Sequence, residues 1–492
     1  MPSIAIPVSL RGQLLYSTRI FDPLSLFALN EPGIWLDPSD LTTMFQDRAG
    51  STAVTTPGQS VGLRLDKSKG LVLGSELFPT LDLSSSQWET LGVLSSVTAN
   101  SFTNSSGAGA GRRYKSGQLL TNGSRYFIDL SFTKSDATTD LQIQAVGGVI
   151  AASSTAASGT LRFRPTSDGT LYLRLSGNAT VTVTSLSVKE LPGNHAVANS
   201  DAARGIYGIE PVGGRRNLLL NTTTMATQNV TVTAAAHTLS FTGTGTVTLS
   251  GVSTAGPLVG TGANDRVSLT FTPTAGTLTL TVSGSVTLAQ LQIGSAFDAY
   301  QRVGTTQYDV TEAGKQTLHY VQYDGSDDGY VTPTITPGID KVQVFAGVRK
   351  LSDAAVGIIY ESSANAGTNA GSIQLYNALD RGIQGRARGS NDVSMATTDI
   401  GAAPLSFVST LQGDISGDTS SIRINGVVRA SSTADQGTGN YLAYPLYIGR
   451  RGGTTLPFNG RDYGIITRFG VNLDASTIAA TESWLNQKTG AF

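Results

Sequence analysis

The sequence consists largely of short segments in which apolar and polar residues alternate, and this pattern limits the fold more than any other feature. Two clear examples are RYFIDLSFT at residues 125–133 and VTVTSLSV at residues 181–188. Successive side chains of a β-strand point to opposite faces of the sheet, so a period of two predicts strands with one buried face. Stretches rich in Gly, Ser and Thr separate these segments and favour turns. The sequence therefore predicts an all-β fold of tandem antiparallel β-sandwiches (jelly-roll-like).

The composition agrees with this fold and excludes several functions. The 492 residues include 57 glycines, and 39% are hydrophobic while only 14% are charged. The net charge of −1 argues against nucleic acid as a partner, because phosphate binding requires an excess of Lys and Arg. The absence of cysteine excludes disulfides and thiolate metal sites. We interpret three arginine pairs as solvated loop charges: Arg112/Arg113, Arg215/Arg216 and Arg450/Arg451.

The N-terminal sequence MPSIAIPVSLRGQLLY lacks the basic start and long apolar core of a secretory signal. No apolar run is long enough to span a bilayer. We therefore expect a protein that is made in a cytoplasm and does not insert into a membrane.

Four domains are predicted along the chain. Residues 1–73 form a first module that includes a possible strand in IPVSL (residues 6–10) and a short helical turn capped by Ser39. This module has few apolar residues, so we expect its GIWL and MF segments to pack on a partner. The other predicted domains are a sandwich resembling a carbohydrate-binding module (74–192), a connector with a second, shorter sandwich (193–315), and a terminal sandwich (316–492).

The two middle domains share an ending. FRPTSDGTLYLRLSGNATVTVTSLSV (residues 163–188) matches FTPTAGTLTLTVSGSVTLAQLQI (residues 271–293) with two short gaps. The shared Phe-x-Pro-Thr element and glycines favour duplication over chance similarity. We interpret the second domain as a reduced copy of the first.

The terminal domain contains the clearest local signals. Asn425-Gly426 lies between two alternating arms and predicts a hairpin, because a type I′ turn needs positive φ at both central residues. The closing segment DASTIAATESWLNQKTG predicts one terminal helix that Asp474 caps and Gly490 ends. Its buried side is expected to hold Ile478, Trp484 and Leu485.

The sequence resembles known families at two levels. YDGSDDGYV, SIRINGVV, LYIGRRGG and FNGRDYGIITRFGVNL resemble segments of concanavalin A-like (laminin-G-like) sandwiches, over about residues 316–490. GIWLDPSDLTTMFQDRAG, PGQSVGLRLDKSKG, RRNLLLNT and FDAYQRVGTTQYDVTEAG resemble segments of tail-fibre and other structural proteins of tailed bacteriophages. Together these resemblances imply a virion protein that ends in a lectin-like domain.

Concanavalin A-like folds also occur in glucanases, which carry three alternating carboxylates on one strand. The sequence has no such strand, since Glu361 is the only glutamate between residues 316 and 474. No nucleophile motif occurs, and His319 is expected to be a strand residue with a hydrogen-bond partner rather than a base. We therefore expect no enzymatic activity and no catalytic residues.

A metal site is possible at one turn. Asp324, Asp327 and Asp328 lie within YDGSDDGY, and oxygen ligands this close together could bind calcium. The alternative is that the same Asp and Gly residues only form the turn. No other cofactor is expected.

A ligand face is predicted on the terminal domain. Gln384, Arg386 and Arg388 are spaced by two, and so are Ser421, Arg423 and Asn425. Guanidinium and amide groups suit hydroxyl-rich or carboxylated sugars, with stacking aromatics from Tyr441, Tyr444 or Tyr447. The alternatives are an ordinary solvent-exposed face and a subunit interface.

These observations lead to one functional hypothesis with two alternatives. The chain is expected to be a homo-oligomeric (trimeric) phage tail fibre that contacts other virion proteins through residues 1–73 and host glycan through its terminal domain. The first alternative is a head fibre or capsid decoration protein. The second is a glycan-cleaving tailspike.

Overall fold

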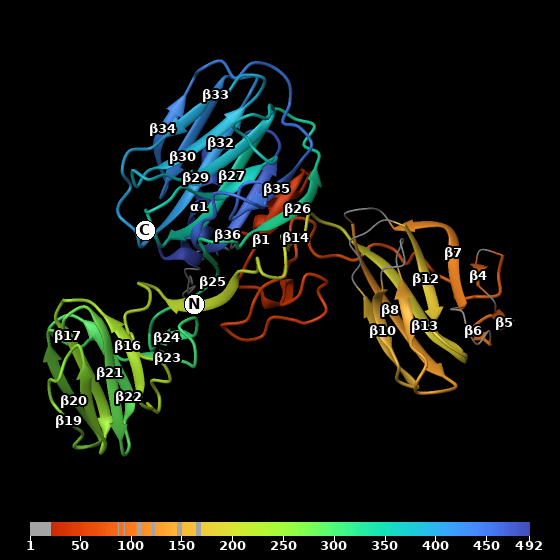
Figure 1. Ribbon diagram of the computed structural model, residues 1–492. Coiled ribbons are helices and arrows are strands. Elements are labelled where there is room, and N and C mark those ends of the chain that lie inside the picture. Colours follow the sequence, from red (N-terminus) through yellow and green to blue (C-terminus); the bar gives the residue numbers. More distant parts are fainter. Residues whose placement is uncertain are drawn as a thin grey trace, which may run out of the picture.

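The computed structural model describes residues 21–86, 88–92, 94–105, 111–120, 124–144, 150–163 and 169–492. The strand predicted at residues 6–10 lies outside these ranges. Figure 1 shows three bodies of β-structure, and their named strands pair in antiparallel fashion. The predicted all-β class is therefore confirmed. In the described part of the chain, no helix combines the length and apolar character that a membrane crossing needs.

The largest body is a sandwich of two sheets, which we call the main sandwich. Seven strands of its eight-stranded sheet have the order β15 (Ile206–Pro211), β25 (Thr317–Asp324), β36 (Asn459–Phe469), β27 (Lys341–Lys350), β32 (Leu405–Asp414), β33 (Thr419–Ile424), β34 (Val427–Ser432). The eighth strand, β1 (Gly33–Leu36), pairs with β36. Its nine-stranded sheet has the order β2 (Met44–Phe45), β3 (Leu63–Arg64), β14 (Ala196–Ala198), β26 (Tyr330–Ile335), β35 (Tyr444–Ile448), β28 (Gly357–Ser362), β29 (Ser372–Asn377), β30 (Ile383–Arg388), β31 (Ser394–Ala396).

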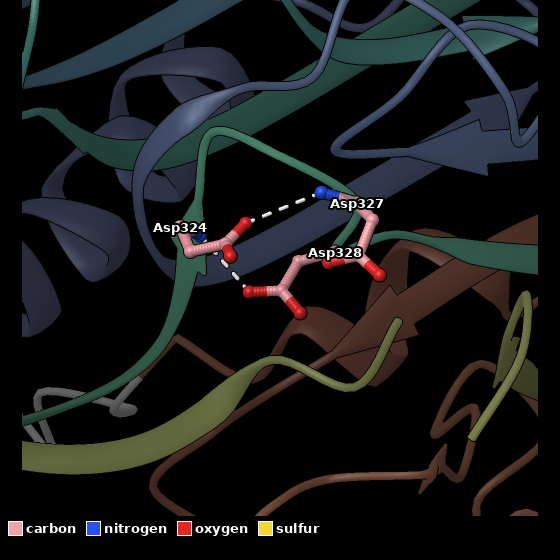
Figure 2. A group of neighbouring side chains, drawn as sticks. All are labelled: Asp324, Asp327 and Asp328. Carbon is pink, nitrogen blue, oxygen red and sulfur yellow. Dashed lines mark hydrogen bonds between the residues drawn. The ribbon is translucent and has the colours of Figure 1, made fainter. Parts of the chain in front are cut away.

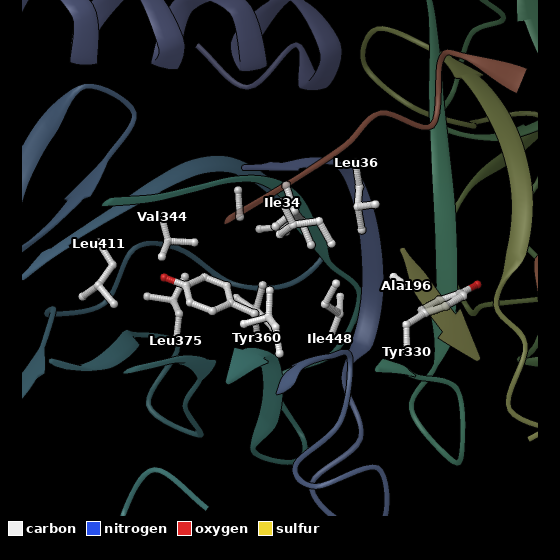
Figure 3. Close-up of a cluster of buried hydrophobic side chains, with 14 of the residues drawn as sticks. Ile34, Leu36, Ala196, Tyr330, Val344, Tyr360, Leu375, Leu411 and Ile448 are labelled. Carbon is white, nitrogen blue, oxygen red and sulfur yellow. The ribbon is translucent and has the colours of Figure 1, made fainter. Parts of the chain in front are cut away.

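The main sandwich therefore draws strands from three distant parts of the chain. In Figure 1 the red β1 lies within the blue C-terminal body, and it pairs with residues 465–468 of β36. Figure 3 shows Ile34 and Leu36 of β1 in one core with Val344 and Tyr360. The boundaries predicted at residues 73 and 316 cut through this sandwich, so the predicted separate N-terminal module is wrong.

The segments expected to contact a virion partner are instead buried inside the chain. All four residues of GIWL are buried in β1. Ile34 and Leu36 face the sandwich core, whereas Trp35 faces the other way and packs edge-on against Trp484 at 5.8 Å between ring centroids. Met44 is also buried in the core. The apolar residues of this region thus complete the main sandwich itself.

A buried ion pair joins the two sheets. The guanidinium of Arg64 on β3 donates two hydrogen bonds of 2.7 Å to the carboxylate of Asp462 on β36. The Tyr323 hydroxyl donates to the same carboxylate at 2.7 Å. Arg64 and Asp462 are each only 1% exposed, so each charge depends on the other for its stabilisation.

The two smaller bodies are inserted at the ends of hairpins of the main sandwich. Strands β3 and β14 are antiparallel neighbours, and so are β15 and β25. The Gly74 amide donates to the Glu190 carbonyl at 2.7 Å where the first insert begins and ends, and the Val212 amide donates to the Gln316 carbonyl at 3.0 Å at the base of the second. A domain whose termini lie this close can extend a hairpin without changing its register.

The first insert is a sandwich of two five-stranded sheets. One sheet has the order β10 (Ile150–Ser154), β9 (Leu141–Gln144), β12 (Gly169–Leu175), β7 (Gly111–Leu120), β4 (Trp88–Leu91). The other has the order β11 (Ser158–Phe163), β8 (Arg125–Lys134), β13 (Ala179–Leu191), β6 (Ser101–Asn104), β5 (Leu94–Val97).

The second insert repeats this topology with fewer strands. Its sheets have the orders β19 (Leu258–Val259), β18 (Thr246–Gly251), β21 (Gly276–Ser283), β16 (Gln228–Val232) and β20 (Gly262–Phe271), β17 (His237–Gly243), β22 (Thr287–Ile293). Strands β16 to β22 thus occupy the two sheets in the same order as β7 to β13 do, and among the described strands of the first insert β4 to β6 lack a counterpart. A separate hairpin of β23 (Gln301–Val303) and β24 (Val310–Glu312) follows. The shared connectivity agrees with the duplication predicted from sequence.

The predicted helix and hairpin are both present. Helix α1 (Ala475–Thr489) begins after Asp474, whose side chain accepts the Thr477 amide, and ends at Gly490 in the left-handed region. It packs on the outer face of the eight-stranded sheet, where Ile478 and Leu485 join Phe345 and Ile466. The turn residues Asn425 and Gly426 have φ of 51° and 77°, as a type I′ hairpin requires.

Two local predictions are wrong. Asp40, not Ser39, caps the 3₁₀ helix η2 (Leu41–Thr43), while the Ser39 amide and hydroxyl donate to Asp37. A second 3₁₀ helix, η1 (Pro23–Phe27), lies before β1.

The second wrong prediction concerns the arginine pairs, which are not simply solvated. One member of each pair is held by another side chain of the protein: Arg113 by Thr90, Arg216 by Glu312, and Arg451 by Glu361.

The buried ion pair yields a first prediction. Asp462→Leu should lower the free energy of unfolding of the main sandwich by about 3–5 kcal/mol, because it leaves the Arg64 charge buried without a partner. Adding Arg64→Met should restore most of that loss. Calorimetry measures both changes. The unfolding transition of the main sandwich must be separated from the unfolding transitions of the inserts. A double variant as unstable as the single one would contradict this account.

The hairpin insertion yields a second prediction. Replacing residues 75–189 with a short Gly-Ser linker should leave the main sandwich folded. Its losses include the hydrogen bonds from Arg125 to the Ala49 and Arg48 carbonyls and the packing of Phe127 on Leu63 and Leu65. Deleting residues 1–73 should instead give insoluble protein, because it removes β1 to β3 and exposes the core. Soluble expression and thermal unfolding distinguish the two deletion variants. A folded, soluble product of the second deletion would refute the discontinuous sandwich.

Candidate functional site

The outer face of the nine-stranded sheet carries the first set of predicted ligand residues. Along β30, Ile383, Gly385 and Ala387 are buried while the residues between them are half-buried. A side chain added at Gly385 would meet Ile422 and Leu411 of the core. Gln384, Arg386 and Arg388 therefore project from the opposite side of β30, as their spacing of two predicts.

Neighbouring groups already hold these three side chains. The Tyr376 hydroxyl of β29 donates to Gln384 Oε1, and Arg386 forms an ion pair with Asp392. The Arg388 guanidinium donates from Nη1 to the Gly367 carbonyl at 2.7 Å. All three remain partly accessible, so this face combines amide, guanidinium and phenol groups at its surface.

Arg423 and Asn425 do not belong to this face. They lie on and beside β33 of the eight-stranded sheet, whose outer face α1 covers. Arg423 pairs with Glu482 of α1 at 2.7 Å, and Asn425 Oδ1 accepts the Val408 amide at 2.9 Å. The predicted single ligand face is thus wrong, because the two sets of residues lie on opposite outer faces of one sandwich. Ser421, which shares the spacing of Arg423, is half-buried beside Gln412.

The three candidate tyrosines have different positions. Tyr441 is 2% exposed and lies in the core. Tyr444 is half-buried and its hydroxyl donates to the Ala370 carbonyl at 3.1 Å. Tyr447 is half-buried and pairs in register with Glu361 on the neighbouring strand. Only Tyr447 is therefore placed beside the polar residues of the outer face.

Sequence reasoning missed the buried part of this face. Glu361, Gln374 and Arg386 are direct cross-strand neighbours on β28, β29 and β30. Glu361 is fully buried, accepts the Ala366 amide at 2.6 Å, and pairs with Arg451 at 3.1 Å. Its burial raises the pKa of the Glu361 carboxyl, against the opposing effect of these two partners. The alternation in SIQLYN could have indicated Gln374, since Ile373 and Leu375 on either side of it are core residues.

The three aspartates of the predicted calcium site lie together at the turn between β25 and β26. Figure 2 shows Asp324, Asp327 and Asp328, whose carboxylates each offer an oxygen within 4.8 Å of the others. Asp324 Oδ1 accepts the Ser326 amide at 2.7 Å, and Asp328 Oδ2 accepts the Asp324 amide at 2.9 Å. Clustered carboxylate oxygens are the ligands that calcium prefers. The hydrogen bonds show that the same residues also build the turn.

The surroundings of the aspartate turn shift the pKa of one of its carboxyl groups. Burial, followed by repulsion from Asp324 and Asp327, raises the pKa of Asp328 to about 7. The Arg450 guanidinium donates to the Asp327 carbonyl at 3.0 Å, and the next residue, Arg451, pairs with Glu361. Arg450 and Arg451 thus connect the aspartate turn to the outer face of the nine-stranded sheet.

His319 is a strand residue, as expected. It lies on β25, and its Nδ1 is 2.8 Å from the hydroxyl of Tyr207 on β15. Burial lowers the pKa of this histidine. The ring also stacks on that of Tyr207, at 6.1 Å between ring centroids.

The aspartate turn yields a third prediction. Calcium at millimolar concentration should raise the melting temperature of the full chain at pH 8 by a few degrees and have much less effect at pH 6. The native Asp328 carboxyl takes up a proton as the pH falls below about 7, and a protonated carboxyl cannot bind the cation. Asp328→Asn should abolish the shift at pH 8. An unchanged melting temperature at pH 8 would contradict calcium binding and would mean that the three aspartates only build the turn.

Comparisons with known proteins assign no family to the chain. The sequence matches no protein-family model and no curated protein. Among solved structures, the CBM40 domain of the Ruminococcus gnavus IT-sialidase bound to α2,3-sialyllactose shares 18% identity, with a TM-score of 0.25 over 29% of this chain and 83% of that one. The leech intramolecular trans-sialidase shares 15% (TM-score 0.25; 30% and 24% of the two chains), and the botulinum neurotoxin serotype D binding domain shares 13% (0.25; 34% and 42%). Similarity at these scores carries no argument about function.

Proposed function

We propose that the chain is a host-contact protein of a tailed-phage virion and that its main sandwich binds glycan on the host surface. The observation that carries the glycan-binding part is the shared outer face of Gln384, Arg386 and Arg388, with Tyr376 on the adjacent strand β29 and Tyr447 further along the sheet on β35. Guanidinium and amide groups make directional hydrogen bonds to sugar hydroxyls and carboxylates. Tyrosine adds an apolar ring with a polar end.

The virion assignment is supported by the order of the tail-fibre-like segments in the sequence. Several of these segments lie in β1 to β3 and in the connectors, so they help to build the main sandwich rather than a separate anchor. A trimer would present three copies of the outer face. Several weak sugar sites acting together would increase the apparent affinity by roughly 10²- to 10⁴-fold.

We propose a binding rather than a hydrolytic role for the outer face. Glycoside hydrolysis needs one carboxyl as acid or base and a second as nucleophile or base. Glu361 is fully buried and held by Arg451 and the Ala366 amide, and Asp392 pairs with Arg386. Both carboxylates thus have structural partners that fix them.

A fourth prediction tests this function. The purified full-length protein should compete with virions of the encoding phage for adsorption to host cells, and Arg386→Ala/Arg388→Ala should lose this competition. Arg429→Ala is the matched control, because Arg429 is exposed on β34 of the other sheet. Antibody labelling of intact virions locates the protein.

The outcomes separate the alternatives. Labelling of the head together with failure to compete would favour a head fibre or decoration protein. Release of reducing sugar from host polysaccharide, lost in Glu361→Gln, would favour a tailspike. Either result would overturn the proposal.

A further inference from the structure

Two adjacent rows of polar side chains lie on the outer face of the nine-stranded sheet. The first row is Glu361, Gln374 and Arg386. Ser372 and Arg388 are paired in the second row, and the buried Ser363 directly follows β28 at the start of the segment that leads to β29. We call these six residues the polar patch.

Several atoms of the polar patch are buried without a hydrogen-bond partner. Gln374 is 1% exposed, yet neither its Nε2 nor its Oε1 has a partner among the described residues. Ser363 Oγ and Arg388 Nε are also buried without a hydrogen-bond partner among the described residues. Buried polar groups in native proteins are nearly always paired with protein, water or ligand. Unpaired donors and acceptors concentrated at one place therefore point to a partner that the chain itself does not supply.

The segment between β28 and β29, residues 363–371, covers this patch. Its backbone meets the patch through the Ala366 amide on Glu361 and the Gly367 carbonyl on Arg388, and the Ser372 hydroxyl donates to its Ala366 and Asn369 carbonyls. Its sequence, SANAGTNAG, contains only small or polar residues, and Ala366 is its one fully buried apolar side chain. Hydrogen bonds rather than apolar contacts hold the segment in place, so opening it would expose little apolar surface.

The charges around the patch favour an anion. Arg386 is paired with Asp392, and Arg451 with Glu361. In the described part of the chain, Arg388 donates to a backbone carbonyl and has no carboxylate partner. A guanidinium with a free Nε–H is suited to a carboxylate, which accepts two parallel hydrogen bonds.

We propose that residues 363–371 form a lid over a binding site for a carboxylate-bearing sugar. Arg388 pairs with the carboxylate of the sugar, while the Gln374 amide and the Ser363 hydroxyl bond its neighbouring hydroxyls. This inference rests on the proposed glycan-binding function and specifies its substrate class as acidic glycan.

The test uses the full-length chain and a panel of uronic-acid-containing oligosaccharides, each paired with the same oligosaccharide after reduction of its carboxyl groups to alcohols. Calorimetric titration should show binding of the acidic form and at least about 10-fold weaker binding of the reduced form, the loss expected for a charge-assisted hydrogen bond. Gln374→Leu should weaken acidic-sugar binding by about 10-fold. Its melting temperature should not fall, because leucine replaces an unpaired amide. Arg388→Gln should weaken binding similarly, whereas Arg429→Gln should not.

Three results would count against the inference. Equal binding of acidic and reduced sugars would overturn it and leave the proposed glycan binding intact. Unchanged acidic-sugar binding by a folded Gln374→Leu and by Arg388→Gln would place the site elsewhere on the chain. Binding of no glycan, in either form, would overturn the proposed function together with the inference.

Discussion

Arg64 and Asp462 form the contact on which the architecture depends. The two residues lie on different sheets, and their side chains meet inside the main sandwich with the Tyr323 hydroxyl. A buried charge is tolerated only beside its counter-charge. The segment that carries Arg64 must therefore occupy its place in the nine-stranded sheet whenever β36 occupies its place in the other. This requirement makes the first and last parts of the chain one folding unit.

The two inserts and the connectors are arranged around this folding unit. Each insert is joined to the main sandwich at the end of a hairpin whose two strands are hydrogen-bonded neighbours. Each insert also has a hydrophobic core of its own. Glu210 of the connector strand β15 is also buried and forms an ion pair of 2.6 Å with Arg461 of β36. The connectors are thus structural parts of the sandwich, and the outer face of the nine-stranded sheet is built on a support that spans the sequence.

Most local features were predictable from the sequence, although the Ser39 cap was not correct, and long-range pairings were not predictable. Period-two alternation predicts β8 and β13, Asn425-Gly426 predicts its turn, and Asp474 and Gly490 bound the helix, because each signal depends on neighbouring residues. Pairing partners leave no such local signal: GIWL shows apolar character but not that β36 covers it. The same limit explains Arg423, whose spacing reveals which way it points but not that α1 lies above it. Gln374 was missed because burial of a glutamine depends on a covering loop.

The sequence separation of the ion pair also affects synthesis of the protein. Arg64 and Asp462 are 398 positions apart, so at roughly 5–20 residues per second the ribosome needs on the order of 20–80 s to supply the second after the first. Both inserts are complete before then and can fold as they emerge. Strand β1, with its four buried residues, has no β36 to pair with during that interval. The nascent chain must therefore carry an unprotected apolar strand until β36 has been synthesised, which makes the yield of folded protein sensitive to temperature and to chaperones.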